Sequence, residues 1–245
     1  MEKPKDRSVA VVDVLRASTT MAYAYARGAA RIIPVASIEA ATALAIQLGE
    51  EVMLCGEREG KRIDGFHLGN SPQEYTEETV AGRTLLLTTT NGTKAIERCE
   101  IAREVVVAGL VNASAVVEYL VAAERNVTLV CAGKFGRFSM EDGLCAGMLV
   151  ARMREAVEGD LELGDSAGAA EIIYRSSPPD TLSILRNCEH GRYLGSLGFD
   201  QDLRVCAEVD ALSVVPVVRQ GRIRREDAPA REDRISQAAN DRPDS

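Results

Sequence analysis

The chain has 245 residues, of which 46% are hydrophobic, 27% are charged and 4% are aromatic. Its formal net charge is −8 and its Lys and Arg residues form no basic run, which argues against a nucleic-acid-binding protein because such proteins need clustered cations. Every apolar stretch is shorter than the roughly 18 to 20 residues of a membrane span, and the charged N-terminus has no signal-peptide core. We therefore expect a soluble cytoplasmic protein without nucleic-acid or membrane partners.

The six cysteines include no C-x-x-C pair, and no Cys/His pair has the spacing of zinc ligands. The sequence therefore predicts neither a disulfide framework nor a structural zinc site.

The first half of the chain alternates short apolar runs with helical stretches. Residues 8–13 (SVAVVD) are typical of a buried parallel strand, and the Ala-rich residues 21–27 predict a helix. A second strand is expected at 31–35, then a helix between a cap at Ser37 and Gly49, then a third strand at 51–55.

The same order of elements follows from residue 84 onward. Strands are expected at 84–88, 103–107 and 127–131, with a short helix after the first and a helix capped by Asn112 after the second. We interpret residues 8–70 and 84–147 as duplicated halves related by a pseudo-two-fold axis. The alternative is the ordinary periodicity of α/β proteins, which repeats strand and helix at similar intervals.

This alternation predicts an α/β fold with βαβ units, a mainly parallel sheet and helices on both faces, in three layers (α/β/α). Polar loops follow the carboxyl ends of the strands, where parallel sheets place their sites, so the matching loops of the two halves would face each other. We expect one domain over residues 1–220, with a helix ending near Gly159, a helix at 166–175, a partly helical segment at 182–195 and a last strand within 206–218. The charged segment 221–245 predicts a disordered tail without an assigned function.

The first of these loops combines an acid, a cation and hydroxyls. Asp13 ends a strand, and Arg16 and the run Ser18, Thr19 and Thr20 follow it at the start of a helix. Arginine side chains and helix N-terminal amides and hydroxyls bind phosphate oxygens, and Asp13 would be a metal ligand beside them. The alternative is a helix cap with a surface arginine.

The equivalent loop in the other half is TTTNGTK, residues 88–94. Asn91 and Gly92 permit a left-handed backbone, and Thr93 would cap the helix while its amide meets an anion. The alternative is an ordinary strand-to-helix turn.

Two further loops supply carboxylates and a cation. Glu57 is the carboxylate nearest a strand end, Lys134 is able to neutralise a phosphate, and Glu141 and Asp142 open a helix. Together with Asp13, these carboxylates would give an all-oxygen Mg²⁺ site. The alternatives are a solvated charge at Glu57 and helix-dipole pairing at Glu141 and Asp142.

The nucleotide-binding fingerprints G-x-x-x-x-G-K-[ST] and G-x-G-x-x-G are absent from the sequence. Residues 164–168 match the G-x-S-x-G nucleophile elbow. A serine hydrolase is nevertheless disfavoured, because the strand before this motif is weak and Asp180 and His190 would have to come from a turn-rich segment.

The chain resembles the 2-phosphosulfolactate phosphatase family over residues 9–218, in the ordered strings VVDVLRASTT, GEREGKRIDGFHLGNSP, TTTNGTKA and CAGKFGRFSMEDGLCAG. The resemblance implies an α/β/α fold and Mg²⁺-dependent hydrolysis of (2R)-2-phospho-3-sulfolactate to (2R)-3-sulfolactate and phosphate, a step of coenzyme M biosynthesis in methanogens. Two features depart from the family pattern. MEKPKDR stands in place of an additional N-terminal strand, and His67 stands where an Asp is expected.

By this resemblance the catalytic residues are Asp13, Arg16, Glu57 and Lys134, and the Mg²⁺ ligands are Asp13, Glu57, Glu141 and Asp142. The substrate-binding residues are Ser18, Thr19, Thr20, Asn70, Asn91, Gly92 and Thr93. The substrate is a small phosphoester that also carries a carboxylate and a sulfonate, so an acidic chain must supply cations locally. Arg58 and Arg137 are therefore expected near the site with Arg16 and Lys134.

Several alternatives remain open. Either a Mg²⁺-activated water attacks the phosphate or Asp13 forms an aspartyl phosphate, and we favour the water because Asp13 does not start a D-x-D pattern. The substrate would be phosphosulfolactate or another small phospho-acid, and a catalytically inactive anion-binding protein is the third alternative. A homodimer is expected only as the commonest assembly of such domains.

Overall fold

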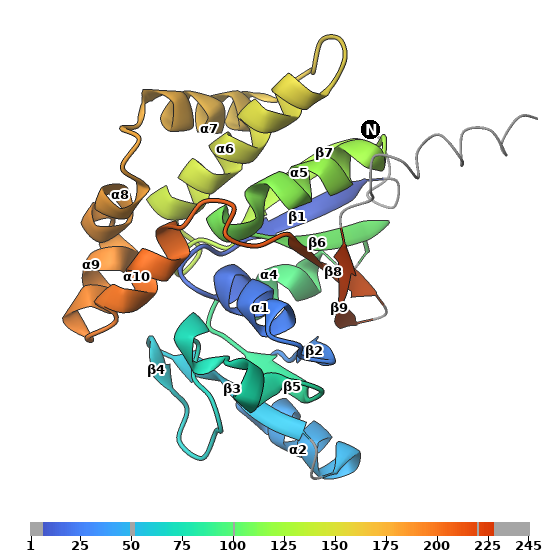
Figure 1. Ribbon diagram of the computed structural model, residues 1–245, viewed down its shortest axis with the longest axis vertical. Coiled ribbons are helices and arrows are strands. Elements are labelled where there is room, and N and C mark those ends of the chain that lie inside the picture. Colours follow the sequence, from blue (N-terminus) through green and yellow to red (C-terminus); the bar gives the residue numbers. More distant parts are fainter. Residues whose placement is uncertain (1–6, 50–51, 100, 220, 228–245) are drawn as a thin grey trace, which may run out of the picture.

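The computed structural model describes residues 7–49, 52–99, 101–219 and 221–227, and shows a mixed α/β protein built on one nine-stranded sheet (Figure 1). The strands are β1 (Ser8–Val12), β2 (Arg31–Pro34), β3 (Val52–Arg58), β4 (Lys61–Arg62), β5 (Thr84–Thr88), β6 (Glu104–Ala108), β7 (Val127–Cys131), β8 (Val214–Arg219) and β9 (Arg222–Asp227). The helices are α1 (Ala17–Ala26), α2 (Ile38–Leu48), α3 (Glu77–Val80), α4 (Gly92–Arg98), α5 (Ala113–Ala122), α6 (Met140–Ala156), α7 (Asp165–Ser176), α8 (Thr181–Asn187), α9 (Glu189–Ser196) and α10 (Asp200–Ala207). Short 3-10 turns lie at Pro72–Glu74 and Leu110–Asn112.

The sheet consists of two parallel groups joined by an antiparallel hairpin. Its strand order is β4-β3-β5-β2-β9-β8-β6-β1-β7. The strand β5 pairs in parallel with β2 and β3, and β1 pairs in parallel with β6 and β7. The hairpin of β8 and β9 links the groups through antiparallel pairs with β6 and β2. The expected parallel strands are therefore present, but the sheet as a whole is mixed.

The central strands of both groups are apolar because neither face of them meets water. All five residues are buried in β1 (SVAVV), β5 (TLLLT) and β6 (EVVVA). Parallel strands covered on both faces are expected to be such continuous apolar runs, which is why the sequence predicted them well.

The helices α1 and α4 pack between the two parallel groups (Figure 1). Met21 of α1 belongs to the same buried cluster as Val9 and Val11 of β1 and Leu85 and Leu87 of β5. The opposite face of the β1 group packs against α5 and α6, and that of the β5 group against α2. Helices thus pack against both faces of the sheet, as the sequence predicted, and the division into three layers stays a prediction.

The strand order is symmetric in the way that the predicted duplication requires. The first strand of each half, β1 or β5, lies between two strands of the other half. Each half thus inserts one strand into the other, and the loops after β1 and β5 belong to one common core. The duplication itself stays a prediction.

The C-terminal segment 221–245 was predicted to be a disordered tail, but it begins with a strand. Residues 222–227 form β9, which pairs along β8 and meets β2 at Ile32 and Ile223. Ile223 is fully buried, and this single apolar position among charged neighbours left no alternating pattern in the sequence. Residues 228–245, and residues 1–6 of the N-terminal segment MEKPKDR that departs from the family pattern, lie outside the described residues.

Among the helices of the described ranges, none combines the length and the apolar character needed to cross a bilayer.

Candidate active site

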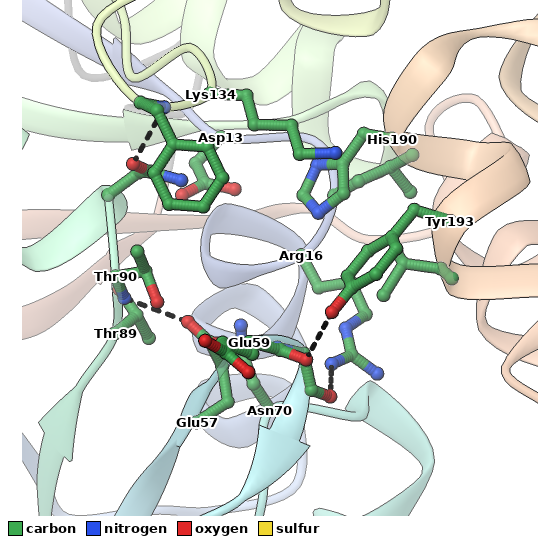
Figure 2. A pocket seen from close by; sticks show the side chains of 15 residues that line it. Asp13, Arg16, Glu57, Glu59, Asn70, Thr89, Thr90, Lys134, His190 and Tyr193 are labelled. Atoms are coloured by element: carbon green, nitrogen blue, oxygen red, sulfur yellow. Dashed lines mark hydrogen bonds between the residues drawn. The ribbon is translucent and has the colours of Figure 1, made fainter. Parts of the chain in front are cut away.

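A cavity of about 220 Å³ lies where loops from both parallel groups meet α9 (Figure 2). It is lined by Asp13, Leu15, Arg16, Glu57, Glu59, Gly60, Asn70, Thr89, Thr90, Asn91, Lys134, Phe135, His190, Tyr193 and Leu194. The loops after β1, β3, β5 and β7 all contribute, so the carboxyl ends of the strands supply the site as the sequence predicted. Of the predicted site residues, the structure brings together Asp13, Arg16, Glu57, Asn70, Asn91 and Lys134.

Asp13 is a buried carboxyl at the end of β1. Its Oδ1 accepts a hydrogen bond from the Ala17 N–H at 3.2 Å, and its own N–H donates to Ser18 Oγ at 2.9 Å. Burial raises the pKa of Asp13 from 3.8 to about 6, opposed by His190 and the Ala17 N–H and reinforced by the charge of Glu57. The protein therefore holds this carboxyl where its ionisation is costly.

Gly92 lets the start of α4 approach Asp13. A Cβ atom at Gly92 would lie 2.5 Å from Asp13 Oδ2 and 2.7 Å from the Ala17 Cβ. The left-handed backbone that Asn91 and Gly92 permit is not adopted, since φ is −121° at Asn91 and Gly92 is not among the glycines with positive φ. The glycine is needed because two chain segments meet there, not because of its turn geometry.

Glu57 is a buried carboxylate at the end of β3, and it joins two loops. Its Oε1 accepts from the Thr90 N–H and its Oε2 from the Gly60 N–H, both at 2.8 Å. These bonds fix the carboxylate on the cavity wall, with lone pairs left for a further contact.

Arg16 lines the cavity, but its guanidinium also has protein partners. Its Nη1 donates to Asp202 Oδ2 and its Nη2 to the Gly60 carbonyl, both at 2.6 Å, and it stacks 4.2 Å from the centre of the Phe199 ring. The second oxygen of the buried Asp202 accepts from Ser71 Oγ at 2.7 Å and from Gln73 Nε2 at 2.8 Å. Asp202 thus connects α10 with two site loops, a role that the sequence analysis missed.

The hydroxyl groups of Ser18, Thr19 and Thr20, which were predicted to bind phosphate, point into the protein. Thr19 Oγ1 donates to the Val14 carbonyl at 3.0 Å and Thr20 Oγ1 to the Asn70 carbonyl at 2.9 Å. Ser18 Oγ accepts from the Asp13 N–H. All three residues are buried and none lines the cavity, so in this arrangement they shape the loops that form its walls.

Thr93 behaves similarly at the start of α4. Its N–H donates to Thr89 Oγ1 at 3.1 Å, and its hydroxyl donates to the Thr89 carbonyl at 3.0 Å. This reciprocal pairing closes the turn after β5 and leaves Thr90 and Asn91 at the cavity.

Lys134 is the predicted cation with the weakest protein contacts at the cavity. Its Nζ lies 3.5 Å from Glu189 Oε1 and 4.7 Å from the centre of the Tyr193 ring. Glu189 is 63% exposed, so this ion pair is screened by water and easily exchanged for a ligand. Tyr193 in turn donates to the Glu59 carbonyl at 2.9 Å.

The other two predicted cations lie outside the cavity lining. Arg58 donates to the Thr88 carbonyl at 3.3 Å and to Thr88 Oγ1 at 3.0 Å, which ties β3 to β5. Arg137 is 68% exposed and pairs with Glu189 at 3.3 Å.

Glu141 and Asp142 are both buried at the start of α6 but do not line the cavity. Asp142 accepts from the Val14 N–H and the Gly133 N–H, each at 2.9 Å, and so joins the loops after β1 and β7. Burial raises the pKa of Asp142 well above its usual value, and the charges of Asp13 and Glu141 add to this. The Asp142 carboxyl group therefore connects these two loops by hydrogen bonds.

The Glu141 carboxylate lies behind His190, a cavity residue that the sequence analysis missed. His190 Nδ1 lies 3.3 Å from Glu141 Oε1. Burial opposes ionisation of Glu141, but the His190 contact and backbone hydrogen bonding outweigh it and lower its pKa. With Nδ1 directed to Glu141, the other ring nitrogen is left for the cavity, which His190 and Lys134 both line (Figure 2). The only available signal was that the chain has just two histidines.

The second histidine, His67, is exposed and lies outside the cavity. Its Nδ1 accepts from the Leu54 N–H at 2.9 Å, which holds the glycine-rich loop against β3. Ser166 of the G-x-S-x-G match is exposed at the start of α7 and likewise does not line the cavity.

The carboxylates predicted to bind Mg²⁺ separate into two sets. Asp13 and Glu57 line the cavity, whereas Glu141 and Asp142 lie behind it. Within the ranges described, no three His, Cys, Asp or Glu side chains are arranged to hold a metal ion. Mg²⁺ bound with substrate often takes only one or two carboxylates, together with waters and phosphate oxygens, so Asp13 and Glu57 fit this smaller ligand set.

Comparison with known proteins agrees with the family resemblance seen in the sequence. The family model described as 2-phosphosulpholactate phosphatase matches residues 1–221. A protein of Thermotoga petrophila named "Probable 2-phosphosulfolactate phosphatase" is 43% identical over 215 residues, covering 88% of this chain and 90% of its own length. Proteins with the same name are 39% identical in Carboxydothermus hydrogenoformans (91% and 92% covered) and 36% identical in Clostridium acetobutylicum (91% and 94% covered).

Proposed function

The chain belongs to the 2-phosphosulpholactate phosphatase family, a family of phosphoric monoester hydrolases, and from this premise we propose that it hydrolyses (2R)-2-phospho-3-sulfolactate to (2R)-3-sulfolactate and phosphate. The observation that carries the proposal is one cavity that gathers Asp13, Glu57 and Lys134 from the carboxyl ends of three different strands. These segments lie in the strings VVDVLRASTT, GEREGKRIDGFHLGNSP and CAGKFGRFSMEDGLCAG, on which the resemblance to the family rests.

The cavity suits a small substrate with several negative charges. Lys134 exchanges its contact with the exposed Glu189 for a phosphate, sulfonate or carboxylate oxygen of the substrate. Arg16 keeps Asp202 and Gly60 as partners and supplies positive potential from the wall rather than a mobile contact. The small volume of about 220 Å³ favours a compact phospho-acid over a nucleotide or a phosphoprotein.

We further propose that Asp13 and Glu57 hold a Mg²⁺ ion together with the substrate phosphate. Both carboxylates line the cavity, and the charge of Glu57 raises the pKa of Asp13, a repulsion that a cation between them relieves. When bound, the ion would neutralise phosphate charge and activate a water for in-line attack.

His190 is proposed to move a proton at the reacting oxygens. Glu141 holds Nδ1, so Nε2 is the nitrogen that meets the substrate or the attacking water. This pair gives the water mechanism a proton acceptor that an attack by Asp13 would not need. Trapping with beryllofluoride tests the choice, because an adduct on Asp13 would replace the water mechanism by an aspartyl phosphate.

The duplication of residues 8–70 and 84–147 is also proposed. The exchange of β1 and β5 between the two parallel groups supports it, as does the shared helix layer of α1 and α4. An experimental structure tests it by superposition: the proposal requires one rotation near 180° to place β1, β2 and β3 on β5, β6 and β7.

Phosphate release from racemic phosphosulfolactate tests the function, measured with Mg²⁺ and with EDTA beside phosphoglycolate and 3-phosphoglycerate. Metal-dependent release that stops near half of the racemate is expected, because a chiral cavity accepts one hand. Activity on the control acids alone would keep a metal-dependent phosphatase and refute the sulfonate substrate. If none of the three compounds releases phosphate although substrate binding is intact, the protein would be an anion-binding protein.

A further inference from the structure

Two buried polar atoms at the cavity have no hydrogen-bond partner. Among side-chain nitrogen and oxygen atoms in the described part of the chain, Asn70 Oδ1 and Thr90 Oγ1 are the buried ones that lack a partner. Both residues line the cavity. Native proteins rarely leave such atoms unsatisfied, and a water or an ion from outside the chain is the usual explanation.

The loop that carries Asn70 is fixed by hydrogen bonds on both sides of this residue. The unpartnered amide oxygen is therefore not explained by a poorly held loop. The Asn70 carbonyl accepts from Thr20 Oγ1 at 2.9 Å, and the Gly69 N–H donates to Glu74 Oε2 at 2.7 Å. On the other side, Ser71 Oγ donates to Asp202 at 2.7 Å. The residue Asn70 is 5% exposed and lines the cavity, so a partner from outside the chain would reach its side chain from the cavity.

The two unpartnered atoms differ in what they are able to bind. Thr90 Oγ1 carries a proton and is able to donate to an anionic substrate oxygen. Asn70 Oδ1 only accepts, and a phosphate, a carboxylate and a sulfonate in their ionised forms have no proton to offer. The substrate of the proposed function therefore satisfies Thr90 Oγ1 but leaves Asn70 Oδ1 without a partner.

The charges around the cavity indicate what satisfies Asn70. Its lining includes the acidic residues Asp13, Glu57 and Glu59 and the basic residues Arg16 and Lys134, and Arg16 is already paired with Asp202. A multiply charged anion entering this lining needs added positive charge. In the view of Figure 2, Asn70 lies on the same side of the cavity as Glu57, opposite Lys134 and His190. Asn70 thus shares its side of the cavity with the Glu57 carboxylate, and Asp13 lies toward Lys134.

We propose that Asn70 Oδ1 belongs, with Asp13 and Glu57, to the oxygen set that holds a divalent cation in this cavity. Carbonyl and carboxylate oxygens are the ligands of hard cations such as Mg²⁺ and Mn²⁺. The inference deepens the proposed function and rests on it for the identity of the anion that shares the cavity. It also changes the part expected of Asn70, whose amide oxygen binds the cation while its NH₂ group stays available to the substrate.

Binding of Mn²⁺ to the full-length, metal-stripped protein tests the proposal, with the free ion counted by electron paramagnetic resonance and no substrate present. Asn70→Leu keeps a similar volume without the acceptor and is expected to weaken Mn²⁺ binding by roughly tenfold or more. Asn70→Asp restores an oxygen acceptor and is expected to bind Mn²⁺ at least as tightly as the wild type. Thr90→Val removes the other unpartnered atom and is expected to leave Mn²⁺ binding unchanged.

Three results would overturn the proposal: unchanged Mn²⁺ affinity in Asn70→Leu, which would assign the position to a water; weaker binding in Asn70→Asp than in the wild type; or an equal loss in Thr90→Val. Melting temperatures identify a variant that does not fold, and Asn70→Asp then decides alone. A wild type that binds no Mn²⁺ yet releases phosphate in EDTA refutes the cation site and keeps the phosphatase. A wild type that binds Mn²⁺ but releases no phosphate from any phospho-acid refutes the phosphatase and keeps the cation site.

Discussion

Replacing Asp13 by asparagine is expected to stabilise the metal-free protein near neutral pH and to abolish phosphate release. The folded protein raises the pKa of Asp13 from 3.8 to about 6, chiefly because the carboxyl is buried. Between these two values the folded state binds more protons than the unfolded chain, so stability falls as the pH rises through this window. Above pH 6 the full penalty is present, and asparagine removes it while still accepting the hydrogen bond from the Ala17 N–H.

The magnitude follows from the difference of about 2 pH units between the two pKa values. At about 1.4 kcal/mol for each unit, ionised Asp13 costs about 3 kcal/mol of folding free energy at pH 7. For a chain of this size, each kcal/mol moves the melting temperature by roughly 2 to 4 °C. Asp13→Asn should therefore melt up to roughly 10 °C higher than the wild type at pH 7 in EDTA, with the gain shrinking toward zero near pH 4.

The assay is a series of thermal melts from pH 4 to pH 8 in EDTA, followed by far-UV circular dichroism. Asp64→Asn is the matched control, because Asp64 is an exposed carboxyl on the loop between β4 and the Pro72–Glu74 turn and its removal changes the charge without relieving burial. The control should show no pH-dependent gain. A melting temperature of Asp13→Asn that stays at or below the wild-type value at pH 7 would refute the burial argument.

Three further predictions concern the residues around Asp13. Arg16→Met leaves Asp202 buried without its cation and should cost about 3 to 5 kcal/mol of stability, measured by urea unfolding; a loss below 1 kcal/mol would contradict this. Gly92→Ala places a Cβ 2.5 Å from Asp13 Oδ2, so it should cost about 1 to 3 kcal/mol and most of the activity, whereas full turnover would show that α4 shifts freely. His190→Asn should lower kcat by roughly 100-fold or more with little change in melting temperature, and near wild-type kcat would remove His190 from the reaction.

The sequence by itself determined the parallel strands, the site loops and the family, but not the short strand β4 or the strand β9. Apolar runs such as residues 8–12 and 84–88 are recognisable because parallel strands buried on both faces tolerate few polar residues. The carboxyl ends of the strands at residues 8–12 and 52–58 place Asp13 and Glu57 at a common site, as the sequence predicted. Local pattern was sufficient here because each element is specified by neighbouring residues.

Only the tertiary structure decided which side chains face the cavity. The hydroxyls of Ser18, Thr19 and Thr20 were expected to face a phosphate, yet they satisfy backbone groups of buried loops, a demand that their spacing does not reveal. Arg16 meets Asp202, which lies 186 residues away in the chain. Pairings at such separation depend on how helices pack over the sheet, and a single sequence carries no local signal of them.

The same reason explains His190 and Gly92. The imidazole gains its place in the site from Glu141 on another helix, and the glycine from the close approach of two loops that start on different strands. Burial and contact across the fold set both roles. In this protein the sequence therefore determined the chemistry that the site has available, and packing between distant segments determined which groups are free to use it.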